Sequence, residues 1–73
     1  MTIQERLRYL REEYKTPLTQ KELGLIFNKG QKAISRLETG EAHLQEDDII
    51  AYCKYFGVSA DFILGLTDCP NPK

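Results

Sequence analysis

Short helical segments separated by strong stop signals are the feature of this sequence that most restricts its fold. Thr2 and Glu5 have the spacing of a capping box, in which each side chain satisfies the other residue's free backbone N–H. Thr19 and Glu22 repeat that spacing. Pro17 ends the first segment, because the residue before a proline is pushed out of helical geometry. The chain is therefore predicted to begin with two short helices.

Glycine and serine mark the helices that follow. Gly40, Gly57 and Gly65 each come just after an apolar helical pattern, where glycine commonly ends a helix. Ser59 is placed to cap the last segment. Helices are expected at about 31–39 and 46–56, with a short one between Ser59 and Gly65. The sequence has no strand pattern, so the predicted fold is all-α, a compact five-helix bundle over residues 1–68.

Apolar residues recur at helical spacing in each segment and are expected to form one shared core. The expected inward-facing residues are Ile3, Leu7, Leu10, Tyr14, Leu23, Ile26, Phe27, Ala33, Ile34, Leu37, Ile49, Ile50, Tyr52, Cys53, Phe56, Phe62, Ile63 and Leu64. Four aromatic residues are expected in this core or in a dimer seam: Tyr52, Tyr55, Phe56 and Phe62.

A chain of 73 residues has room for one domain and no large internal active-site cavity. We find no nucleophile–base pair and no metal-ligand cluster. Cys53 and Cys69 lack CxxC spacing, and the lone His43 cannot complete a four-ligand site with them. We therefore expect free thiols, no metal, no cofactor, no small-molecule substrate and no enzymatic activity.

No apolar run approaches the roughly 18 residues needed to span a membrane. The N-terminus lacks the basic and apolar stretches of a signal peptide. We therefore expect a cytoplasmic protein without a membrane partner. Residues 69–73 contain two prolines and are expected to be a terminus or a linker stub.

The charges are divided unevenly along the chain. Residues 1–40 carry eight Lys and Arg against five Glu, a net charge of +3. Residues 41–73 carry two Lys against six acidic residues, a net charge of −4. Such asymmetry in a small domain suggests that one face meets an anionic partner.

The stretch from 20 to 40 has the features of two helices joined by a tight turn. Gly24 is the small residue that a close helix crossing needs, and Asn28 tolerates the positive φ of a sharp reversal. Ile34 and Leu37 hold the second helix against the core. This leaves long or polar side chains on the exposed face: Gln31, Lys32, Ser35 and Arg36. Gln matches the N6 and N7 atoms of adenine, and Arg or Lys matches the O6 and N7 atoms of guanine.

Three stretches in this order resemble the Cro/cI-type phage-repressor helix-turn-helix family, also called XRE. They are residues 18–23, 34–40 and 56–65, and the resemblance covers about residues 3–68. It implies a lambda-repressor-like fold, a bacterial or phage origin and a double-stranded DNA operator as partner. It also implies a homodimer on two half-sites about 34 Å apart.

The resemblance and the exposed face together give a set of candidate site residues. The expected base contacts are Gln31, Lys32, Ser35 and Arg36. The expected phosphate contacts are Thr19, Gln20, Lys21 and Lys29. The resemblance further implies an ion pair between Arg11 and Glu38, which would tie the first helix to the third.

Some positions depart from the family pattern. Gly24 stands where alanine is usual, which costs up to about 1 kcal/mol in helix propensity. Lys29 stands where the turn usually has an apolar residue, and the link from Tyr14 to Pro17 is about two residues longer than typical. The loop after Gly40 is acidic and runs into Glu46, Asp47 and Asp48, which favour a helix start but should repel phosphate.

The leading hypothesis is a sequence-specific transcriptional regulator, a repressor, that reads the major groove with its third helix as a dimer. Two alternatives stay open: an antitoxin of a toxin–antitoxin pair, and a protein-interaction module that has lost DNA binding. The acidic loop motivates the last of these.

Overall fold

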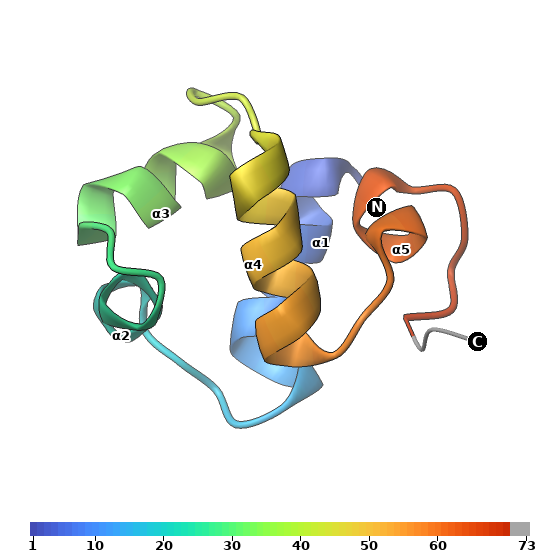
Figure 1. Cartoon of the computed structure of the whole chain (residues 1–73), viewed down its shortest axis with the longest axis horizontal. Coiled ribbons are helices and arrows are strands. Elements are labelled where there is room, and N and C mark those ends of the chain that lie inside the picture. The colour runs from blue at the N-terminus through green and yellow to red at the C-terminus, as the bar shows by residue number, and fades with distance from the viewer. Residues whose placement is uncertain (71–73) are drawn as a thin grey trace.

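Helices form all the regular structure in residues 1–70, which are the residues that the computed structural model describes (Figure 1). The elements are α1 (Ile3–Tyr9), η1 (Leu10–Tyr14), α2 (Gln20–Ile26), α3 (Gln31–Thr39), α4 (Glu46–Phe56) and α5 (Ala60–Leu64). The predicted all-α class and the five-helix bundle are confirmed. Part of the expected tail, residues 71–73, lies outside the described residues.

Both predicted capping boxes are formed. Glu5 N donates to Thr2 Oγ1 at 3.1 Å, and Thr2 N donates to Glu5 Oε1 at 2.7 Å. The hydrogen bond from the Thr2 backbone lowers the pKa of the Glu5 carboxyl. Thr19 and Glu22 make the same pair of bonds at 3.0 and 2.8 Å. Because capping depends on residues three apart, these helix starts could be predicted from the sequence alone.

The first helix does not continue as one α-helix. Leu10–Tyr14 forms a π-helical turn, η1, which holds more residues per turn than an α-helix does. The wider turn buries Leu10 and Arg11 side by side. Leu18 N then donates to Arg11 O at 3.0 Å, so the longer link before α2 folds back onto η1. The sequence pattern predicted the helical face but not this change of pitch.

The core lies between the helices and is formed by Leu7, Leu10, Leu23, Ile34, Leu37, Tyr52, Phe56, Val58, Phe62 and Ile63. Three residues that were expected to face inward are instead exposed: Ile26, Ile50 and Leu64. Phe27 takes the inward place beside Ile26, with its ring centroid 5.0 Å from that of Tyr52. On α4 the buried residues are four apart, at 48, 52 and 56, so Ile50 is on the opposite side of the helix.

The segment after α5 packs back onto α1 through Arg6, one of the basic residues that were counted in the net charge of residues 1–40. Its guanidinium donates to Phe62 O at 2.9 Å, to Thr67 O at 3.0 Å and to Asp68 Oδ1 at 3.0 Å. It also lies 4.7 Å from the centroid of the Phe62 ring. Ser59 N donates to Pro70 O at 3.1 Å. These bonds close the bundle on the side of α4 away from α2 and α3 (Figure 1).

None of the helices within residues 1–70 has the length and apolar character to cross a membrane. In the same residues, no three His, Cys, Asp or Glu side chains gather closely enough to hold a metal ion. Cys53 is half-buried and Cys69 exposed, both as free thiols, and burial raises the pKa of the Cys53 thiol.

Candidate DNA-binding surface

The turn between α2 and α3 is drawn tightly against α2 at Gly24. Lys29 N donates to Gly24 O at 2.6 Å, and Asn28 has the positive φ of 59° that was predicted for the reversal. A Cβ on Gly24 would lie 2.9 Å from Lys29 O and 3.1 Å from Gly30 C. Glycine at 24 therefore meets a steric requirement of this turn, as the predicted need for a small residue at a close helix crossing implied.

The first turns of α3 present an exposed polar face. Ile34, Leu37 and Glu38 are buried and hold the helix against the domain. The opposite side carries the exposed residues Gln31, Lys32 and Arg36, and Ser35 lies half-buried at its edge. Within residues 1–70, these four side chains make no hydrogen bond or ion pair with the rest of the domain. The structure thus brings the predicted base contacts together on one face.

Glu38 is the centre of a buried polar cluster behind that face. Its side chain is fully buried and accepts from Arg11 Nε at 2.6 Å and from Arg11 Nη2 at 2.9 Å. The bond to Glu38 raises the pKa of the Arg11 guanidinium. Gln20 Nε2 also donates to Glu38 Oε1, at 3.1 Å. The pair implied for Arg11 and Glu38 is thus present, and it also holds Gln20, a predicted phosphate contact, in one orientation.

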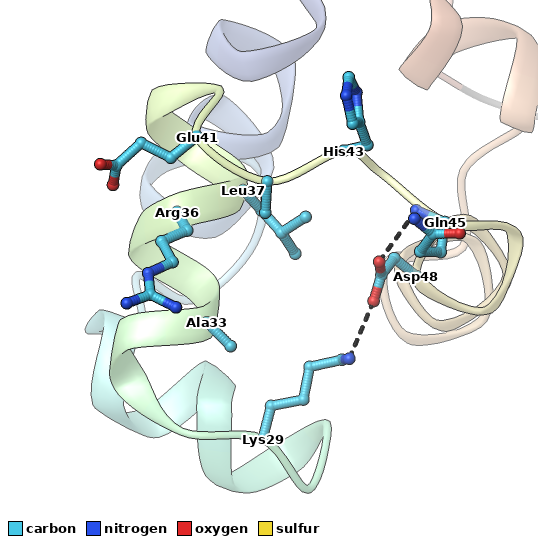
Figure 2. Close-up of a pocket in the computed structure, with 9 residues that line it drawn as sticks. Lys29, Ala33, Arg36, Leu37, Glu41, His43, Gln45 and Asp48 are labelled. Carbon is cyan, nitrogen blue, oxygen red and sulfur yellow. Dashed lines mark hydrogen bonds and ion pairs between the residues drawn. The ribbon is translucent and has the colours of Figure 1, made fainter.

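Lys29, another predicted phosphate contact, pairs instead with α4. Its Nζ lies 3.1 Å from Asp48 Oδ1, across an open groove of about 440 Å³ between α3 and the loop that follows it (Figure 2). Ala33 and Leu37 line this groove, while the guanidinium of Arg36 points away from it. Ala33, which was expected to face the core, is only half-buried.

The acidic start of α4 differs from the sequence interpretation at Asp48. This side chain is 6% exposed, and its Oδ2 accepts from Gln45 N at 3.0 Å. Glu46 and Asp47 are exposed, as is Glu41 in the loop. Asp48 was counted among the residues that repel phosphate, but it is buried and paired with Lys29. The acidic surface near α3 is therefore smaller than the sequence suggested.

Asp48 could have been recognised from its spacing. It lies four residues before Tyr52 and eight before Phe56, on the buried stripe of α4. A carboxylate on such a stripe needs a partner, because an unpaired buried charge is strongly unfavourable. The sequence does not show that this partner is Lys29, since the two residues meet only after α2, α3 and α4 have packed.

Residues 7–63 of the chain match the helix-turn-helix family. The chain belongs to this family. The match runs from α1 into α5 and includes both helices of the candidate surface, α2 and α3. The resemblance to phage-repressor domains that the sequence predicted is therefore confirmed.

Two individual proteins are similar to this helix-turn-helix chain. An uncharacterized HTH-type transcriptional regulator, YobD, from Bacillus subtilis (strain 168) is 33% identical over 69 residues, which is 94% of this chain. The chain spans 60% of that relative's length. The crystal structure of the P22 c2 repressor protein in complex with synthetic operator 9T is 28% identical. It matches with a TM-score of 0.75, over 88% of this chain and 94% of that one.

Proposed function

We propose that this helix-turn-helix domain binds a specific double-stranded DNA operator and regulates transcription as a repressor. The observation that carries the proposal is the exposed face of α3, which presents Gln31, Lys32 and Arg36. The opposite face of the same helix is buried and holds it against the domain. The names of the two similar proteins, a transcriptional regulator and a repressor bound to its operator, support it. In this proposal the protein acts by binding DNA rather than by catalysis, and it acts in the cytoplasm.

In this proposal α3 enters the major groove and reads base edges. Gln31 is suited to adenine, because its side-chain NH2 can donate to adenine N7 while its carbonyl oxygen accepts from the N6 amino group. Lys32 and Arg36 are suited to guanine O6 and N7. Ser35, at the edge of the face, contributes a shorter contact to either kind of base.

Phosphate contacts in the proposal come from the start of α2. Thr19 and Lys21 are exposed there, and Gln20 is oriented by its bond to the buried Glu38. A phosphate contact from a held amide fixes the register of the protein on the duplex without carrying sequence information. Lys29 is left out of this set because its ammonium already pairs with Asp48.

We also propose that two copies of the domain bind one operator. Helix-turn-helix dimers place their recognition helices in half-sites about 34 Å apart. Leu64 and Leu66 are exposed, and they lie at the end of α5 and just after it, away from α2 and α3. The proposal predicts a two-fold symmetric operator and a mass of two chains per duplex.

The first test is an unbiased selection of duplexes from a random pool by the whole chain. We expect one enriched motif with two related half-sites. Arg36→Ala and Gln31→Ala should each cost roughly 1–3 kcal/mol of binding free energy at the base that the residue reads. Glu13→Ala, an exposed change on η1 away from α3, is the control and should leave binding unchanged. Full operator binding by the Gln31→Ala/Arg36→Ala double variant would contradict the assignment.

A further inference from the structure

We propose that Lys29 is a positioning residue for operator binding, which acts through Asp48 to hold the start of α3 against α4 and makes no phosphate contact. The inference rests on the proposed DNA-binding function. It gives a role to a predicted phosphate contact whose charge is already paired within the domain.

Asp48 is a strong anchor for the Lys29 ammonium. Both of its carboxylate oxygens are engaged, Oδ1 with Lys29 Nζ and Oδ2 with Gln45 N. The carboxylate is 6% exposed, so it is shielded from water on the core-facing side of α4. If Lys29 moved to a DNA phosphate, it would leave this buried carboxylate without its cationic partner, which is strongly unfavourable. A single exposed phosphate contact does not offset that loss.

Lys29 is held at both ends. Its backbone N–H bonds to Gly24 O in α2, and its side chain reaches α4. The residue therefore joins two elements beside the groove that Ala33 lines (Figure 2). Because α3 begins only two residues later, at Gln31, this double attachment sets where the first base-reading side chains lie.

The bridge also has an electrostatic consequence. Lys29 and Asp48 neutralise each other, so together they add little to the charge that a DNA duplex meets. The salt dependence of DNA binding reports the number of phosphates that the protein neutralises. We therefore expect the pair to affect operator affinity through the position of α3 and to leave the salt dependence unchanged.

The test compares variants on the duplex that the wild-type chain selects from a random pool. Asp48→Asn removes the charge yet keeps an oxygen that can accept from Gln45 N. Asp47→Asn is its matched control, because it removes an exposed acid at the neighbouring position. Lys29→Met keeps the apolar stem of the lysine, and Lys29→Met/Asp48→Asn removes both charges. Dissociation constants are measured over a series of salt concentrations, with helix content and the melting temperature checked for each variant.

We expect Asp48→Asn and Lys29→Met each to bind about tenfold more weakly than Asp47→Asn, with the wild-type slope of log K against log salt. The double variant should be no weaker than either single variant, because the two residues act as one unit.

A phosphate contact from Lys29 would give a different pattern, which would overturn the proposal. Asp48→Asn would then bind at least as tightly as Asp47→Asn, because it frees the ammonium. Lys29→Met would lower the salt slope by about 0.9, the value for one lost phosphate contact. If Lys29→Met unfolds, the comparison of Asp48→Asn with Asp47→Asn still decides between the two patterns. If the wild-type chain enriches no duplex, the DNA-binding function itself is wrong, and this inference fails with it.

Discussion

Gly24 shows how two local effects compete at a single residue. Alanine is a better helix former than glycine by about 1 kcal/mol, which favours a substitution in the middle of α2. The new methyl carbon, however, would lie 2.9 Å from Lys29 O and 3.2 Å from Gln31 N. These neighbours are backbone atoms of the turn and cannot rotate away as a side chain could. The steric effect therefore outweighs the gain in helix propensity.

We predict that Gly24→Ala destabilises the domain by about 1–3 kcal/mol, as overpacking of a tight contact does. Urea unfolding measures this change in the free energy of unfolding. Gly30→Ser is the control, because a Cβ at Gly30 meets no atom within 4 Å and serine is a favourable cap for α3. Equal or greater stability of Gly24→Ala would show that the turn relaxes at little cost.

At the scale of the elements, one buried carboxylate joins three segments that also contribute to the apolar core. Glu38 on α3 binds Arg11 on η1 and Gln20 at the start of α2. Arg11 also donates to Leu18 O at 2.8 Å, so the link before α2 is attached to the same cluster. The π turn brings the Arg11 side chain into the interior beside Leu10. The orientation of α2 relative to α3 therefore depends on polar contacts as well as on the core.

We predict that Glu38→Gln lowers the free energy of unfolding by about 3 kcal/mol, because it leaves the buried Arg11 charge without its carboxylate. That is a large part of the roughly 4–11 kcal/mol expected for a domain of this size. Glu41→Gln is the matched control, since Glu41 is exposed. Similar urea midpoints for the two variants would mean that the cluster contributes little to stability.

Over the whole molecule, the two ends of the bundle have different roles. Figure 1 shows α2 and α3 on one side of α4, with α5 on the other. The first side carries the polar face of α3, while the second is closed by Arg6 and the ring of Phe62. Loosening the closing contacts should therefore leave the recognition face in place.

We predict that Arg6→Met increases hydrogen exchange locally, at the amides of Ser59 and Leu66, more than in α3. Ser59 N bonds to Pro70 O, and Leu66 lies in the segment that the arginine holds. Selective exposure of this kind is local opening rather than global unfolding. Amide hydrogen exchange monitored by NMR measures Ser59 and Leu66 separately from the amides of α3. A uniform loss of protection across α3 and α5 would contradict this division.

The local features of the domain could be predicted from the sequence, because their causes lie within a few residues of one another. The capping box of Thr19, the positive φ of Asn28 and the helix end at Gly40 all follow from neighbours along the chain. So does the exposed face of α3, because Ile34 and Leu37 at helical spacing determine which side is buried.

The contacts that join separate elements were decided only by the tertiary structure. The sequence places Lys29 in an exposed turn and Asp48 on the buried stripe of α4, but it does not show that they are partners. They pair because α4 packs across the groove beside α3. Arg6 becomes buried for the same reason. Helix signals act over three or four residues, whereas ion pairs and steric limits depend on distances between residues far apart in the chain. The sequence therefore indicated which side chains face outward, and the packing determined which of them are still available to a ligand.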